Sequence, residues 1–321
     1  MDRIKYDKPS LNFKEQVDLL IKRGMIIDDR KRAERLLANI SYYRLSAYML
    51  PYKINKDGVI IDRFRDGTNW NEVYRLYLFD RKLRLLVFDA IERIEIAIRT
   101  QIIYQLSQKY GSHWQDKREI FKAPRDIITK DGMSIHIDIY DELQKHISNQ
   151  LINNHAEEFL VHYRNTYCEP VNPPSWMCVE IMFFNQLLKI CNGLKKRSDL
   201  TDLSNYFSLP PSAFCSWLHT LNFIRNICAH HARLWNRTFN IVPEKLIHAQ
   251  PGKVWLNGTS VVQTSRCYYL FSIINYFLQT ANPTSSFKLR LVKLLTDYED
   301  VVSLKVLGFP EDWKKEEMWS V

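Results

Sequence analysis

The residues of this chain best suited to chemistry lie in one short stretch, residues 225–237, which read RNICAHHARLWNR. An arginine presents a planar fork of N–H donors to phosphate oxygens, and an imidazole can accept or release a proton near neutral pH. Arg225 and His230 therefore combine a phosphate ligand with a proton-transfer group. Asn226 follows the arginine, and because an amide cannot titrate, we expect it to orient His230 or a phosphate.

The hydrophobic pattern around this stretch predicts a single helix from Pro211 to Asn236. A helix advances about 100° per residue, so side chains within one arc share a surface. One side of this helix carries arginine, asparagine and histidine but no glutamate or lysine, a combination suited to phosphate. Besides the three residues above, we expect phosphate contacts from Asn222, Arg233 and Arg237.

Arg225 and His230 lie too far apart on one helix to flank the same phosphate easily. Their spacing places them roughly 140° apart around the axis and about 7.5 Å apart along it. Two copies related by a two-fold axis could instead bring the arginine of one helix to the histidine of the other. Ala229, with almost no side chain, would let the two helices approach closely. The spacing therefore favours a site shared between two chains.

Several polar residues also have a structural interpretation. His231 falls on the apolar arc of the same projection, so we expect a hydrogen-bonded core histidine. Glu95 and Arg99 are i,i+4 neighbours on another predicted helix, where a salt bridge is the default and an orienting role toward the site stays open. For Arg233 and Arg237, ion pairs with distant acids are the alternative to phosphate contacts.

Composition limits the classes of protein to which the chain can belong. Its 321 residues are 46% hydrophobic and 25% charged, as in ordinary globular proteins. A net charge of +9 favours an anionic partner, nucleic acid first. The six cysteines show no C-x-x-C pair and no zinc spacing, so we expect reduced thiols in a cytoplasmic protein and no metal or other cofactor. No signal core and no apolar run of about 18 residues occurs, which predicts no membrane association.

Hydrophobic periodicity predicts an all-α protein. Only nine glycines occur, and apolar residues recur at helical spacing over long stretches. The longest predicted helix covers about residues 69–110, and later ones cover about 175–196, 263–280 and 285–296. We expect an N-terminal helical region at 1–68 with a small β-hairpin near 53–64, a helical core at 69–245 with an irregular insertion at about 111–172, and a C-terminal helical tail at 246–321.

The chemical residues also carry a resemblance. Arg225, Asn226 and His230 match the R-polar-x(3 to 5)-H motif of HEPN ribonucleases, and residues 217–237 resemble the signature of the AbiD/AbiF-like abortive-infection family of bacterial phage-defence proteins. The resemblance covers roughly residues 5–240. Further blocks that resemble this family lie at residues 8–24, 42–45, 79–84, 89–95 and 174–180.

The resemblance implies a HEPN-like helical bundle with additional N- and C-terminal helices, acting as a homodimer with a composite active site. It implies a metal-independent endoribonuclease toxin that cleaves RNA through the 2′-hydroxyl and is silenced by an antitoxin such as a small non-coding RNA. Arg225 would stabilise the reacting phosphate, His230 would move the proton and Asn226 would orient them. The RNA contacts would come from Asn222, Arg233 and Arg237, with Glu95 and Arg99 as orienting residues.

Two alternatives use the same residues without turnover. The basic face could grip a structured RNA as a non-catalytic binding module, or the chain could act as a protein dimerisation scaffold. Tyr42, Tyr43 and Arg44 could stack on bases, although packing is the preferred interpretation in a chain with 17 tyrosines. RNA binding that weakens with salt is expected of both the nuclease and the binding module, and turnover separates them.

Overall fold

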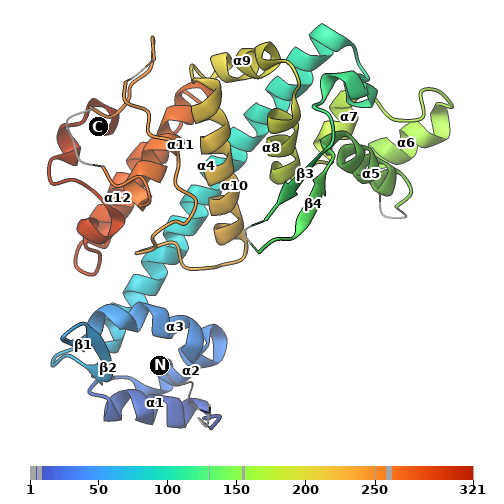
Figure 1. Ribbon diagram of the computed structural model, residues 1–321. Helices are drawn as coiled ribbons and strands as arrows, with labels where there is room; N and C mark the ends of the chain where they lie inside the picture. Colours follow the sequence, from blue (N-terminus) through green and yellow to red (C-terminus); the bar gives the residue numbers. More distant parts are fainter. Residues whose placement is uncertain are drawn as a thin grey trace.

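The computed structural model describes residues 5, 9–129, 131–153, 156–248, 250–257 and 262–320. Within these ranges the chain forms twelve α-helices and two small antiparallel hairpins, which confirms the predicted helical fold (Figure 1). The helices are α1 (Phe13–Lys22), α2 (Arg30–Ile40), α3 (Tyr42–Met49), α4 (Trp70–Tyr110), α5 (Ile139–Leu151), α6 (Glu158–Thr166), α7 (Ser175–Glu180), α8 (Phe184–Gly193), α9 (Arg197–Tyr206), α10 (Pro211–Ala229), α11 (Cys267–Ala281) and α12 (Phe287–Asp297).

The central element is α4, whose 41 residues give it a length of about 60 Å. Asn69 caps its first turn by accepting a hydrogen bond from the Asn71 N–H, and Gly111 ends it with a φ of 88°. Figure 1 shows α4 running from the N-terminal helices to the neighbourhood of α7 and α9. Its apolar seam, the residues that recur at helical spacing on one side, is buried along the helix and comprises Leu76, Phe79, Leu83, Leu86, Ala90, Ile94, Ile98 and Ile102.

The N-terminal region follows its local sequence signals. Asp29 caps α2 by accepting from the Arg32 N–H, and Ser41 caps α3 by accepting from the Arg44 N–H. The predicted hairpin is confirmed as β1 (Lys53–Lys56) paired with β2 (Val59–Phe64). Asp57 and Gly58 form its turn, both with positive φ, as the aspartate-glycine pair requires.

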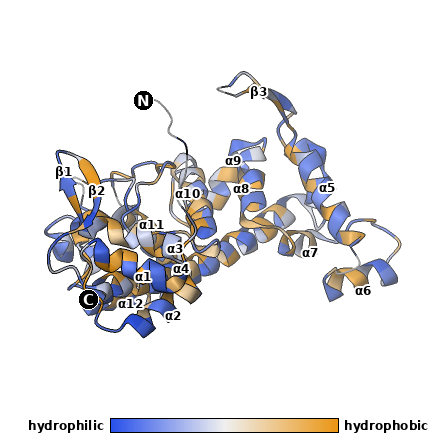
Figure 2. Ribbon diagram, turned by 90° about the horizontal axis from the view of Figure 1, so that it is seen from below, coloured by the Kyte–Doolittle hydropathy of each residue, from blue (hydrophilic) through white to orange (hydrophobic). Residues whose placement is uncertain are grey.

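A second hairpin, β3 (Arg125–Ile128) paired with β4 (Ser134–Ile137), was not predicted. It lies in the insertion expected to be irregular, which also contains α5 and α6. All four residues of β3 are exposed, so the strand has no buried face to give a period of two in the sequence. Figure 2 shows this hairpin projecting away from the helices.

The C-terminal part of the chain contributes to the main core. Eleven residues of α11 are buried, and Figure 1 shows this helix alongside α4 and α10. Tyr276 of α11 meets the Trp217 ring of α10 edge-on at 5.4 Å, and Trp255 lies 5.1 Å from the same tryptophan. One continuous cluster of buried side chains therefore extends from α1 to Trp319. No helix in the described part of the chain has the length and hydropathy needed to span a bilayer.

Two predicted helices are wrong in extent. The helix expected at 175–196 is divided into α7 and α8. At the break, the Arg99 guanidinium donates hydrogen bonds to the carbonyl oxygens of Val179, Glu180 and Met182, which a continuous helix would use itself. The helix expected from Pro211 to Asn236 ends at Ala229.

After α10, His230 forms the C-cap and His231 has a φ of 55°, so residues 232–237 leave the helix axis. The projection used for Arg233, Asn236 and Arg237 therefore does not apply.

We predict that Ile94→Ala lowers the free energy of unfolding by about 2–5 kcal/mol, because it removes a fully buried side chain from the α4 seam. Ile96→Ala, two residues away and 54% exposed, is the matched control and should cost about 0.5 kcal/mol or less. Urea denaturation of both variants measures the difference. Equal losses in the two variants would contradict the assignment of the buried face.

Candidate functional site

Arg225 lies where α10 crosses α4. Its guanidinium carbon is 5.8 Å from the centre of the Phe88 ring, and its Nε is 4.0 Å from Glu95 Oε2. The side chain is 32% exposed, yet the Nε is buried and has no hydrogen-bond partner. Phe88 and Glu95 therefore hold the guanidinium in place, and its exposed terminal amino groups, which have no acceptor among the described residues, are the part that could bind an anion.

Glu95 and Arg99 connect this arginine to α7. The predicted Glu95–Arg99 pair is present, with Arg99 Nη2 donating to Glu95 Oε1 at 3.1 Å. Burial raises the pKa of Glu95, although the neighbouring guanidiniums of Arg99 and Arg225 oppose the rise. Arg99 donates to the carbonyl oxygens of Val179 and Glu180 at the end of α7, and Glu95 is the member of the pair that lies beside Arg225. A cleft of about 350 Å³ opens here, lined by Phe88, Glu92, Glu95, Ile96, Arg99, Glu180 and Arg225.

His230 and Asn226 lie on the exposed side of the last turn of α10. The His230 N–H donates to the Asn226 carbonyl oxygen at 2.9 Å, as in the continuing helix. Neither side chain has a hydrogen-bond partner within the described part of the chain. Arg225 faces α4 instead, and in the described residues of a single chain it makes no contact with His230.

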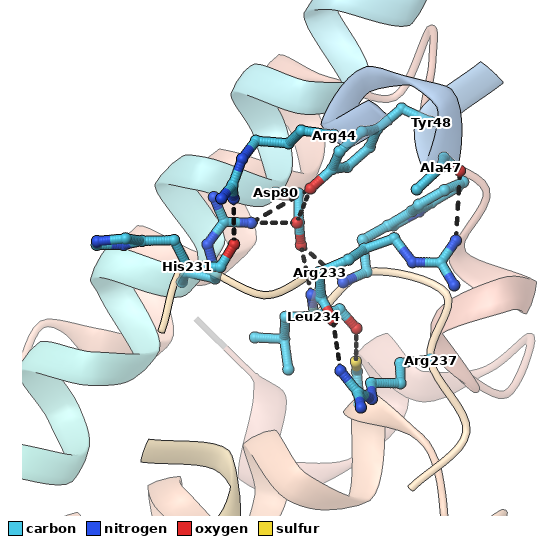
Figure 3. A network of polar contacts seen from close by, with 11 residues as sticks. Arg44, Ala47, Tyr48, Asp80, His231, Arg233, Leu234 and Arg237 are labelled. Atoms are coloured by element: carbon cyan, nitrogen blue, oxygen red, sulfur yellow. Dashed lines mark hydrogen bonds and ion pairs between the residues drawn. The ribbon is translucent and has the colours of Figure 1, made fainter. Parts of the chain in front are cut away.

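The prediction that His231 is a core histidine is wrong. Its side chain is exposed, because α10 ends two residues before it and the helical projection no longer sets its direction. Arg44 Nη1 donates to the His231 carbonyl oxygen at 2.5 Å, which ties the turn to α3 (Figure 3). His231 lines a pocket of about 500 Å³ between α3, α4 and the end of α10.

Asp80 is the residue that fixes the segment after α10. Its side chain is fully buried on α4 and accepts from the Tyr48 hydroxyl at 2.5 Å and from Arg84. It also accepts from the backbone N–H groups of Leu234 at 3.2 Å and Trp235 at 2.6 Å (Figure 3). Burial raises the pKa of Asp80, while Arg84 and Tyr48 oppose the rise. Since every partner donates, the surroundings match an ionised carboxylate.

Asn222 lies on α10, and its side-chain amide is 3.5 Å from the Asn185 side-chain oxygen. Arg233 donates to the Ala47 carbonyl oxygen at 3.3 Å, and Arg237 donates to the Arg233 carbonyl oxygen at 3.4 Å. Both arginines are half-buried in the loop after α10. Within the described ranges neither makes an ion pair, so the alternative proposed for them is not observed.

Sequence reasoning missed Asp80, and a signal for it existed. Asp80 follows Leu76 by four residues and precedes Leu83 by three, so it occupies the buried seam of the predicted helix. Arg84 follows at i+4 and supplies the counter-ion. An acid with a basic residue one turn later inside an apolar stripe indicates a buried pair with further donors.

Metal ligation finds no support in the geometry. Across the residues that the structure describes, no group of three His, Cys, Asp or Glu side chains is placed to hold an ion. All six cysteines are free, as expected, and burial raises the pKa of Cys228 to about 12.

Comparison with known proteins gives one match. Residues 35–236, more than half of the chain, match the family model described as Abi-like protein. No curated protein and no solved structure matches the chain. The matched range runs from α2 to the loop after α10, so it contains Asp80, Arg225 and both histidines of the turn.

We predict that Asp80→Ala lowers the free energy of unfolding by about 3–5 kcal/mol, because Arg84 is left buried without its counter-ion. Hydrogen exchange should also accelerate at the amides of Leu234 and Trp235, which lose their acceptor. The control is Asp89→Ala on the same helix, whose more exposed ion pairs with Arg93 and Arg290 should each contribute about 1 kcal/mol or less. Unchanged exchange in Asp80→Ala would contradict the assigned role.

Proposed function

Because the chain belongs to the Abi-like protein family, which indicates a role in abortive infection, we propose that it performs this role as a metal-independent endoribonuclease. The observation that carries the proposal is the state of Arg225. Its guanidinium is anchored over Phe88 and beside Glu95, while the side chain is 32% exposed and its terminal amino groups have no hydrogen-bond acceptor among the described residues. A phosphate oxygen could bind the exposed terminal amino groups of this guanidinium, and His230, exposed at the end of the same helix, is free to move a proton.

The reaction needs only positioning, proton transfer and charge stabilisation. The RNA 2′-oxygen attacks the adjacent phosphorus in line, the bond to the 5′-oxygen breaks, and a 2′,3′-cyclic phosphate and a 5′-hydroxyl result. In our proposal His230 accepts the proton of the 2′-hydroxyl and returns it to the departing 5′-oxygen. Arg225 stabilises the additional negative charge on the pentacoordinate phosphorus, and Asn226 orients the histidine or the phosphate. DNA lacks the attacking hydroxyl and is not a substrate.

The placement of the two side chains supports a composite site. Arg225 packs against α4, whereas His230 is exposed and makes no contact with Arg225 among the described residues, which favours a phosphate bound by groups from two chains. We propose that two chains pair through the ends of α10, each giving its arginine to the histidine of the other. Glu95 then acts as a positioning residue for Arg225, and Arg99 holds Glu95.

Contacts beyond the reacting phosphate would come from the same region. We propose that Asn222 contacts RNA from α10, and that Arg233 and Arg237 use the N–H groups that their carbonyl acceptors leave unused. A regulatory non-coding RNA that occupied this basic surface would silence the enzyme by excluding its substrate. The net charge of +9 supports attraction of either RNA.

The first test is cleavage of end-labelled RNA by purified protein in EDTA. His230→Ala and Arg225→Ala should each lose at least about 100-fold in rate, because one removes the proton carrier and the other the charge stabilisation. His219→Ala, an exposed histidine on the same helix, is the matched control and should retain activity. Mapping of the ends should find 2′,3′-cyclic phosphates. Full cleavage by either variant would overturn the assignment.

A second test addresses the composite site. When equal amounts of Arg225→Ala and His230→Ala are mixed and allowed to exchange, half of the dimers contain one chain of each kind. One of their two sites then has both residues, so about a quarter of the wild-type activity should return. Activity that stays at the level of the separate variants, although size analysis shows mixed dimers, would place both residues in one chain or neither in the site.

The runner-up is a non-catalytic RNA-binding module, which the net charge of +9 also favours. It predicts the same salt-sensitive binding but intact RNA in the cleavage assay. A dimerisation scaffold predicts no salt-sensitive RNA affinity.

A further inference from the structure

The pocket beside His231 is lined by none of the residues to which we assign the reaction. Its volume of about 500 Å³ lies within the range of roughly 300–1,000 Å³ typical of small-molecule sites. Three separate parts of the chain form it, namely α3, α4 and the end of α10 with its turn. Phe88 lines this pocket and also the cleft of Arg225, so the two are neighbours.

The charge of this pocket is positive. Arg44, Arg81 and Arg84 line it, and none of its described lining residues is an acid. The positive charge of Arg84 is neutralised by its ion pair with the buried Asp80. Arg81 is exposed and makes no ion pair in the described ranges. Arg44 donates one of its N–H groups to the His231 carbonyl oxygen and keeps the others. Two guanidiniums are therefore free to bind an anion.

The neighbouring cleft, which contains Arg225 and shares Phe88 with this pocket, is mainly acidic. Its charged lining residues are three acids, Glu92, Glu95 and Glu180, and two arginines, Arg99 and Arg225. A phosphate chain that reaches Arg225 is therefore repelled from continuing among these carboxylates and attracted toward Arg44 and Arg81.

The remaining walls are apolar and aromatic. Tyr77, Leu85 and Phe88 line the pocket along α4, and Leu85 is 57% exposed. Aromatic faces next to arginines form the combination on which bases of single-stranded nucleic acid stack while their phosphates are bound. Such a surface suits a nucleotide better than it suits inorganic phosphate alone.

We propose that this pocket holds one nucleotide of the RNA strand, adjacent to the cleaved linkage. Its phosphate binds Arg44 and Arg81, and its base packs against Tyr77, Leu85 and Phe88. The hydrogen bond from Arg44 to His231 fixes the arginine before RNA arrives, so the pocket is preorganised. The inference rests on the proposed action on RNA and adds a binding subsite outside the arginine-histidine motif.

Binding of a fluorescent 2′-O-methyl RNA hexamer tests the pocket without cleavage, because the attacking hydroxyl is blocked. Arg81→Ala should weaken binding about tenfold and reduce the slope of log affinity against log salt by about 0.7, the loss of one phosphate contact. Lys82→Ala is the matched control, since the Lys82 ammonium lies over the Tyr298 ring, 5.1 Å from its centre. It should leave the affinity within about twofold and the slope unchanged.

A second pair of variants does not remove any arginine. Leu85→Glu places a carboxylate at the rim of the pocket and should weaken binding of the hexamer at least about tenfold. Leu85→Gln, whose side chain has the shape of glutamate without its charge, should keep the affinity within about threefold of wild type. Leu85 is exposed enough for the fold to tolerate both substitutions, which circular dichroism checks. Adenosine 5′-monophosphate should bind far more weakly than the hexamer.

The outcomes separate this inference from the nuclease proposal. If wild-type protein cleaves RNA while Arg81→Ala and Leu85→Glu bind the hexamer normally, the pocket is not an RNA subsite. Adenosine 5′-monophosphate binding as tightly as the hexamer overturns the assignment to an RNA strand. If the hexamer depends on Arg81 but wild-type protein leaves RNA intact, the subsite stands and the nuclease fails.

Discussion

The buried carboxylate of Asp80 is the interaction on which the rest of the site depends. A carboxylate removed from water loses several kcal/mol of hydration, so it persists only where donors replace the solvent. Here Tyr48 comes from α3, Arg84 from α4, and two backbone amides from the segment after α10. One side chain thus joins three elements that are distant in the sequence. Their relative position follows from satisfying a single charge.

That constraint also determines where the chemical residues lie. Because Asp80 binds the amides of Leu234 and Trp235, the segment after α10 is held against α4. The helix ends, His231 turns into the left-handed region, and both histidines become exposed at its end. Arg225, one turn earlier, stays against Phe88 and Glu95. Two neighbouring clefts of opposite charge result, and Phe88 lines both of them.

The sequence predicted the helices best where local signals and burial agree. The seam of α4 repeats at helical spacing over 41 residues, and Asp29, Ser41 and the Asp57-Gly58 turn mark boundaries through local hydrogen bonds. The prediction failed for two reasons. At 175–196 a distant group, Arg99, interrupts the expected helix. In β3 every residue is exposed, so no alternation of buried and exposed residues marks the strand. Neither effect is visible in the residues of the segment itself.

For the candidate site, the sequence by itself determined which chemical groups are present and that Arg225 and His230 leave α10 in different directions. Helix geometry is local, so five residues of spacing suffice for that conclusion. Only the tertiary structure decided that α10 stops at Ala229, that His231 is exposed rather than buried, and that Arg44 and Arg81 share its pocket. The reason is physical. Burial of Asp80 requires donors from far along the chain, and no local pattern encodes which amides will supply them.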